Sequence, residues 1–177
     1  MPAVEIVPLT ATGLDAHRDG LAELLLDAIA DGASVGFLAA TSPAQAAAWW
    51  AEQRPAVADG SRLLWIARDG AGRALGTVAL VRETKPNGRH RAELVKLLVH
   101  RDARGAGLGR RLLATAEQAA RDSAATLLLL DTQTGSPAEH LYRTAGWTPY
   151  GIVPGHAATP DGERAATTFF YKELDGA

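Results

Sequence analysis

The feature that most constrains this chain is an uninterrupted series of strand, glycine-rich turn, helix and strand over residues 91–131. Arg91 to Val99 ends in apolar residues and predicts a strand, and Gly107 to Ser123 places leucine and alanine at helical spacing. The segment from Thr126 to Asp131 contains four consecutive leucines, which suit a strand buried on both faces. Together these segments predict a parallel β-α-β unit with a right-handed crossover.

The segments around this unit predict a mixed α/β sheet. Before it we expect a strand at Val4–Pro8, a helix ending at Gly32, a second helix from Pro43 to Ala58, and strands at Ser61–Arg68 and Ala74–Glu83. After it we expect a helix at Pro137–Ala145 and strands at Thr148–Val153 and Ala166–Glu173, joined by a long loop. The predicted order is β-α-α-β-β-β-α-β-α-β-β, an antiparallel meander followed by the β-α-β unit, in one domain spanning residues 1–177.

Composition excludes several functional classes. The formal charge is −2, with 18 Lys and Arg against 20 Asp and Glu, so we expect no nucleic-acid partner. There is no cysteine, which removes thiolate metal sites and a cysteine nucleophile, and the five histidines show no ligand spacing, so we expect no metal. No apolar run is long enough to span a membrane and no leader pattern opens the chain, so we expect no membrane partner and a cytoplasmic location.

The turn of the β-α-β unit has the sequence Arg104-Gly105-Ala106-Gly107-Leu108-Gly109. Its glycines allow consecutive backbone N–H groups to converge on an anion at a helix N-terminus, so the turn predicts a phosphate site. A Walker A loop is excluded because no Gly-Lys-Ser/Thr follows. A dinucleotide turn is disfavoured because its third glycine would stand at position 110, which is Arg110, and its first would directly follow the strand.

The pattern Arg104-x-x-Gly107-x-Gly109, preceded by an apolar strand and opening a helix, resembles the pyrophosphate loop of the GNAT acetyltransferase superfamily. A second block, Ala138-x-x-x-Tyr142-x-x-x-Gly146-Trp147, is similar to a helix of that superfamily, although Gly135 stands where many members carry Asn. The resemblance implies acetyl-CoA as cosubstrate. The cofactor-binding residues that it implies are Leu97, Leu98, Val99, Arg104, Gly105, Ala106, Gly107, Leu108, Gly109, Arg110, Ala138 and Arg143.

Within the superfamily, three stretches look like the tabtoxin-resistance type. They are Glu93 to Arg101, Leu130 to Glu139 and the loop with Pro154-Gly155 and Pro160-Asp161-Gly162. The likeness runs from about residue 60 to the end of the chain.

Three residues are candidates for catalysis. A primary amine is mostly protonated at neutral pH, so a base is expected near the acetyl group, and Glu93 and Asp131 lie on strands whose carboxyl ends meet at one crevice. Which of the two acids is the base and which binds the amine stays open, and either could instead be a strand or turn residue. The resemblance implies that Tyr142 protonates the leaving thiolate; the alternative is a half-buried tyrosine with a bonded hydroxyl.

The sequence therefore predicts an N-acetyltransferase that transfers the acetyl group directly, in a ternary complex, to a primary amine of a small molecule such as an amino acid, antibiotic or toxin. The alternatives are a protein or peptide amine acetyltransferase and a non-catalytic acetyl-CoA sensor. We expect a monomer or a homodimer.

Overall fold

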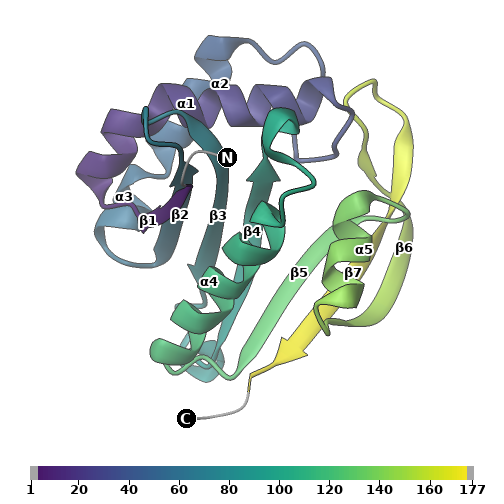
Figure 1. Ribbon diagram of the computed structural model, residues 1–177. Coiled ribbons are helices and arrows are strands. Elements are labelled where there is room, and N and C mark those ends of the chain that lie inside the picture. Colours follow the sequence, from purple (N-terminus) through teal and green to yellow (C-terminus); the bar gives the residue numbers. More distant parts are fainter. Residues whose placement is uncertain (1–3, 175–177) are drawn as a thin grey trace.

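The computed structural model describes residues 4–174, which form a seven-stranded sheet in the order β1-β2-β3-β4-β5-β7-β6 (Figure 1). The strands are β1 (Glu5–Pro8), β2 (Arg62–Arg68), β3 (Ala74–Arg82), β4 (Arg91–Val99), β5 (Leu127–Gln133), β6 (Thr148–Ala158) and β7 (Arg164–Glu173). The helices are α1 (Ala11–Ala30), α2 (Pro43–Glu52), α3 (Arg54–Ala58), α4 (Leu108–Asp122) and α5 (Pro137–Thr144), with short 3₁₀ turns at Pro86–Gly88 and Arg101–Ala103. Only β4 and β5 pair in parallel, so the predicted fold class and β-α-β unit are confirmed.

The sheet separates two hydrophobic clusters. On one face α4 and α5 contribute residues such as Leu112 and Tyr142, which pack with Leu128 of β5. On the other face Leu21 of α1 and Trp50 of α2 pack over β2 and β3. Strand residues alternate between these clusters, as the period of two in a strand requires, so each side chain can be assigned to one face of the sheet.

Two predicted boundaries were wrong, both for reasons that involve proline. The predicted helix from Pro43 to Ala58 is divided at Gln53 into α2 and α3, because Pro55 has no N–H and is tolerated only in the first turn of a helix. The predicted long loop after Val153 is mostly strand: β6 continues to Ala158, and a tight turn leads directly into β7. Pro154 is accommodated because it lies in a register shift on the edge strand of the sheet.

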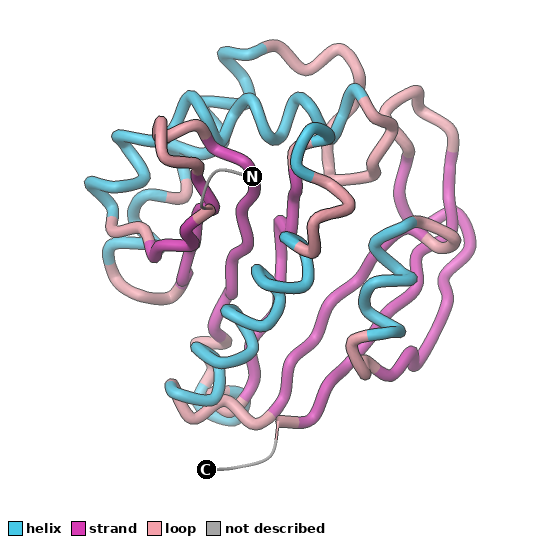
Figure 2. Tube along the Cα trace, in the orientation of Figure 1, coloured by secondary structure: helices cyan, strands magenta, loops and turns pink. Residues whose placement is uncertain are grey.

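Strand β4 is irregular at its centre and leaves its neighbour soon after it begins. A register shift separates the pairs Ala79↔Val95 and Thr77↔Leu98, and within this bulge Lys96 has a φ of 53°. On the other side of β4, parallel pairing with β5 covers only residues 91–93 and 127–129. Figure 2 shows β5 diverging from β4 beyond this short ladder. The separation leaves the edge of β4 unpaired on that side beyond Glu93.

A buried ionic cluster ties α4 to the far half of the sheet. The carboxylate of Glu117 accepts the Trp147 indole N–H at 2.9 Å and two hydrogen bonds from the Lys172 ammonium at 2.9 and 2.8 Å. The same ammonium donates to the Ala145 carbonyl at 2.9 Å. Every group in the cluster is therefore bonded, which is the condition under which a buried ion pair is tolerated.

We predict that Lys172→Met lowers the free energy of unfolding by about 3 kcal/mol, because it removes the cation that is hydrogen-bonded to the buried Glu117 carboxylate and leaves only the longer pair with Arg121 at 3.9 Å. Urea denaturation measures the loss. Lys85→Met, which removes an exposed lysine from a turn, is the control and should change the free energy little. Equal effects of the two substitutions would contradict the role given to the cluster.

Candidate active site

The unpaired edge of β4 forms one wall of the candidate site. The predicted cofactor residues Leu97, Leu98 and Val99 lie on this segment. The Leu98 side chain is buried with the α1 and α2 cluster, whereas Leu97 and Val99 pack toward α4. Their side chains thus belong to the core on both faces, and what they offer to a ligand in the gap is the backbone.

The glycine-rich turn lies directly beyond this edge and leads into α4. Gly105 and Gly107 have φ values of 77° and 76°, in the left-handed region that favours glycine. Among the residues described, none accepts a hydrogen bond from the backbone N–H groups of residues 105–110. Gly107 caps α4 without any side-chain hydrogen bond, so the positive end of the helix dipole and this series of free donors point to the same place. The turn has the backbone of an anion site.

The residues of the turn also make packing contacts and hydrogen bonds within the protein. Leu108 is buried in the core and therefore contributes only its N–H group. A Cβ on Gly109 would stand 3.4 Å from Leu141, so this glycine allows α4 to approach α5 closely. The Arg104 guanidinium donates to the Val99 carbonyl at 3.1 Å and pairs with Asp31 at 2.5 Å.

Arg110, the next residue along α4, donates to the side-chain and backbone oxygens of Thr144 at 2.9 and 3.3 Å. The two arginines that the sequence assigned to the cofactor thus join the turn to α1 and α5. Their contact with acetyl-CoA stays a prediction.

Helix α5 holds the second sequence block. Ser136 caps it and accepts from the Glu139 N–H at 3.2 Å, while the Glu139 carboxylate accepts the Gly135 N–H at 2.5 Å. The Arg143 guanidinium, predicted to contact the cofactor, bonds Glu139 at 2.7 Å and lies 5.4 Å from the Phe170 ring. The Gly135 N–H and Arg143 lower the pKa of Glu139. Ala138, also predicted, packs partly buried against the core.

Tyr142 has a buried ring and a hydroxyl without a protein partner. Its ring packs near Trp147 and Phe170, with centroid distances of 5.9 and 6.1 Å. No described residue exchanges a hydrogen bond with the hydroxyl, in contrast to the bonded hydroxyl expected of a purely structural tyrosine. Burial, and then the charge of Asp131, raise the pKa of Tyr142, so the hydroxyl keeps its proton at neutral pH.

The two candidate acids lie on the same sheet face, opposite α4. Glu93 stands directly across from Leu129 in the short parallel ladder, and Asp131 follows two residues later on β5, within the strand rather than at its end. Partial loss of hydration and then the charge of Asp131 raise the pKa of Glu93, against the opposing charges of Arg62 and Lys96. The sheet therefore brings the two acids together, as predicted.

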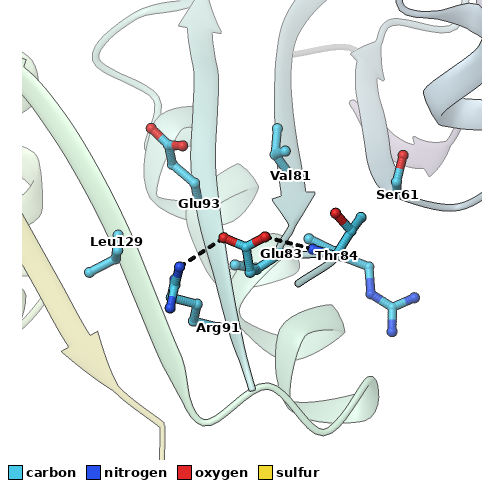
Figure 3. Close-up of a pocket in the computed structure, with 9 residues that line it drawn as sticks. Ser61, Val81, Glu83, Thr84, Arg91, Glu93 and Leu129 are labelled. Atoms are coloured by element: carbon cyan, nitrogen blue, oxygen red, sulfur yellow. Dashed lines mark hydrogen bonds and ion pairs between the residues drawn. The ribbon is translucent and has the colours of Figure 1, made fainter. Parts of the chain in front are cut away.

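A pocket of about 450 Å³ opens on this face, with Ser61, Val81, Glu93 and Leu129 among its lining residues (Figure 3). Glu83 and Arg91 form an ion pair at 2.8 Å on one side of it. The Glu93 carboxyl points away from that pair in Figure 3. Among the residues described, Glu93 thus has no ion-pair partner beside the gap between β4 and β5.

Sequence reasoning missed two cations on this face. Lys96 emerges from the β4 bulge, where its ammonium donates to the Val35 carbonyl at 3.1 Å and lies 4.9 Å from the Trp49 ring. Arg62 of β2 lies 6.0 Å from the same ring. The alternation of β2 could have placed Arg62 on this face. The bulge at Lys96 could not be predicted, because nothing in the sequence indicates that this lysine has a positive φ.

Comparison with known proteins agrees with this geometry. Residues 37–147 match the acetyltransferase (GNAT) family, and because the match covers more than half of the chain, the protein belongs to that family. A suggested acetyltransferase from Acinetobacter baylyi ADP1 superposes with a TM-score of 0.81 at 21% identity, covering 100% of this chain and 96% of the other. The ribosomal-protein-alanine N-acetyltransferase from Brucella melitensis gives 0.75 at 23% identity, covering 96% and 99%.

A phosphinothricin acetyltransferase from Sinorhizobium meliloti, solved with acetyl-CoA, gives a TM-score of 0.77 at 18% identity and covers 98% of this chain and 90% of the other. Membership of the GNAT family makes the protein an N-acetyltransferase of the class that takes acetyl-CoA as cosubstrate. In residues 4–174 no helix is long and apolar enough to cross a membrane.

We predict that Gly107→Ala weakens acetyl-CoA binding at least tenfold, because an alanine at positive φ shifts the free N–H groups and loses a charge-assisted hydrogen bond. Gly60→Ala is the matched control: Gly60 has a φ of 77° and, like Gly107, has no atom within 4 Å of the point where a Cβ would stand. Both variants should lose about 1 kcal/mol of stability. Calorimetry that finds the same affinity in both would remove the turn from the cofactor site.

Proposed function

We propose that this enzyme acetylates a primary amine of a small molecule by direct transfer in a ternary complex, in the manner of the tabtoxin-resistance type. The observation that carries the proposal is the placement of Glu93 and Asp131 on one sheet face at the point where β4 and β5 separate. The acetyl-CoA site of the family and two carboxylates suited to an amine then share one gap. A non-catalytic sensor would need neither acid.

A small acceptor is favoured by contacts between the β6–β7 turn and the segment joining α1 to α2. The Ser34 hydroxyl donates to the Ala158 carbonyl at 3.0 Å, and the Ala39 N–H donates to the Pro160 carbonyl at 2.8 Å. Figure 1 shows the turn of this hairpin meeting the α1–α2 segment. These contacts hold the hairpin against the α1–α2 segment, which disfavours the open groove that a protein or peptide acetyltransferase needs.

In the proposed reaction Glu93 accepts a proton from the ammonium form of the acceptor, directly or through one water, and the free amine attacks the thioester carbonyl carbon. The C–N bond forms, the attacking nitrogen gives up its second proton to water, the C–S bond breaks, and the thiolate of CoA leaves. Asp131 holds the ammonium form before attack. The free N–H groups of residues 105–110 hold the pyrophosphate, and the unpaired backbone of β4 is the hydrogen-bonding edge for the thioester end of the cosubstrate.

Tyr142 is proposed to protonate the leaving thiolate. Its raised pKa keeps the proton available, and its hydroxyl is not committed to a protein acceptor in the part of the chain described. The small Ala138 lies one helical turn before it on α5, leaving room on that side of the helix.

The proposal is tested by following thiol release from acetyl-CoA with a panel of amines that contains amino acids, phosphinothricin, aminoglycosides, polyamines and short peptides. We expect turnover with at least one small amine and none with the peptides. Turnover confined to the peptides would favour the protein acetyltransferase, and acetyl-CoA binding without any turnover would favour the sensor.

We predict that Tyr142→Phe lowers turnover about 100-fold, at the lower end for a positioned acid, while acetyl-CoA affinity and melting temperature stay nearly unchanged. Stability is retained because the hydroxyl makes no hydrogen bond within residues 4–174 and the ring is preserved. Tyr150→Phe, on the exposed edge strand, is the control. A stable Tyr142→Phe enzyme with full activity would exclude the general-acid role.

We predict that Glu93→Gln lowers turnover by about 10²–10⁴-fold and removes the acid limb of the pH–rate profile, since a base works only when deprotonated. A carboxyl with a raised pKa contributes stability at low pH that is lost as the pH rises through the folded-state pKa, so the variant should melt at a higher temperature than wild type at pH 7 but not at pH 4. Asp131→Asn measured in parallel separates the two acids: a larger loss of the acid limb there would make Asp131 the base.

A further inference from the structure

Four charged side chains gather on the acceptor face without pairing with one another. They are Arg62 from β2, Glu93 and Lys96 from β4, and Asp131 from β5. Among residues 4–174 none of the four takes part in an ion pair within 4.0 Å, and their one side-chain hydrogen bond runs from Lys96 to a backbone carbonyl. The charges are nevertheless close enough to act on one another, since Arg62 and both acids alter the pKa of Lys96.

Strand register gives these charges an order across the sheet. Arg62 stands opposite Val81, Val81 opposite Glu93, and Glu93 opposite Leu129. Two of the charged residues, Arg62 and Glu93, therefore lie in one row across the sheet, with Val81 between them and Leu129 at the β5 end. Neighbouring strands lie about 4.8 Å apart, which puts the backbones of Arg62 and Glu93 about 10 Å from each other. Asp131 lies beyond Glu93 on the far side of the row. The negative charges therefore lie toward β5 and a positive charge toward β2. Val81, Glu93 and Leu129 of this row line the pocket of Figure 3, and Ser61, the residue before Arg62, lines it as well.

Among the four charged residues, Arg62 has buried nitrogen atoms that bond no protein acceptor in the described chain. These are its Nε and Nη1 atoms. Leaving a buried donor unsatisfied costs about 1–3 kcal/mol, more for a charged group, so such atoms are rare unless something else bonds them. Burial lowers the pKa of Arg62, against the opposing charge of Glu93. A planar guanidinium offers parallel donors that match the two oxygens of a carboxylate or phosphinate.

Lys96 supplies a second positive charge from an unusual backbone position. A φ of 53° is costly for a residue with a side chain, and such positions persist mainly where the surrounding structure needs them. The bulge directs the ammonium toward the aromatic wall, 4.9 Å from the Trp49 ring and 5.9 Å from the Phe37 ring. The cation is thereby held on the acceptor face without an ion pair to any residue of the part of the chain described.

We propose that Arg62 binds an acidic group of the acceptor, so that the acceptor is an amino acid or a similar compound in which an oxyanion group lies a few bonds from the reactive amine. The amine faces Glu93 and Asp131, the oxyanion bonds the Arg62 guanidinium after a rotation of that side chain exposes its buried edge, and Lys96 adds to the positive field. The inference rests on the proposed function, because it assigns the same pocket to the acceptor. It makes Arg62 a specificity-determining residue.

The experiment compares amino acids with their carboxamides, which keep the amine and lose the acid. Thiol release from acetyl-CoA measures turnover, and the melting temperature with each compound alone measures binding. The variants are Arg62→Met, Arg62→Lys and the control Arg89→Met, which removes an exposed arginine from a turn. We expect at least one amino acid to have a kcat/KM at least 100-fold above that of its carboxamide. Arg62→Met should bring this ratio close to one, Arg62→Lys should restore part of it, and Arg89→Met should leave it unchanged.

Arg62→Met should not lower the melting temperature of the free enzyme, because the buried guanidinium atoms bond no protein acceptor. A marked loss of stability would show a structural role and overturn the inference. Equal turnover of amino acids and carboxamides would overturn it while leaving the proposed function intact. Binding of amino acids that depends on Arg62, without turnover of any amine, would support the subsite and contradict the proposed function. Neither turnover nor binding of any amino acid would overturn the inference, and the proposed function would be contradicted as well only if no other small amine of the panel were turned over.

Discussion

The separation of β4 from β5 is the constraint on which the rest of this structure depends. The two strands pair in parallel for only three residues each and then diverge, which leaves the edge of β4 without a partner. Because unpaired backbone groups inside a protein are costly, this arrangement makes sense only if something else bonds them. We propose that this partner is acetyl-CoA, and the free N–H groups at the start of α4 lie at the same end of the gap.

The charged residues on the two faces of the sheet also differ in whether they are paired. On the α4 side the core is apolar up to the buried Glu117 cluster, where every charge is bonded. On the opposite face the four charges around the acceptor pocket are left without ion-pair partners among the residues described. The contrast separates charges that hold the fold together from charges that are free to meet a ligand. Unmatched charges cost stability in the free enzyme, and substrate binding is where that cost can be recovered.

Much of the fold was predictable because it follows from local patterns. Helical spacing in α4, four leucines in β5 and the glycines between β4 and α4 each indicate one conformation, and together they predicted the β-α-β unit correctly. The extent of β6 was not predictable, because Pro154 and Gly155 favour a loop and only pairing with β7 makes the segment a strand. The break at Gln53 depended on one proline within a pattern that otherwise continued as a helix.

The parts of the candidate site that lie on the predicted strands and in the glycine-rich turn were predictable from the sequence. Glu93, Asp131 and the turn residues could be proposed from their positions alone. Arg62 and Lys96 could not be recognised as partners, because their meeting depends on a bulge and on strands that are adjacent in the sheet but distant in sequence. Likewise, no sequence pattern shows that Arg104 and Arg110 bond Asp31 and Thr144.

The central claim is that acetyl-CoA lies in the gap between β4 and β5, with its pyrophosphate on the turn that opens α4. A crystal structure of the enzyme with a non-reactive acetyl-CoA analogue tests it most directly. The account predicts pyrophosphate oxygens within hydrogen-bond distance of backbone N–H groups of residues 105–110, and the acetyl end beside β4 beyond Glu93. An analogue bound elsewhere, with those N–H groups still unbonded, would contradict it.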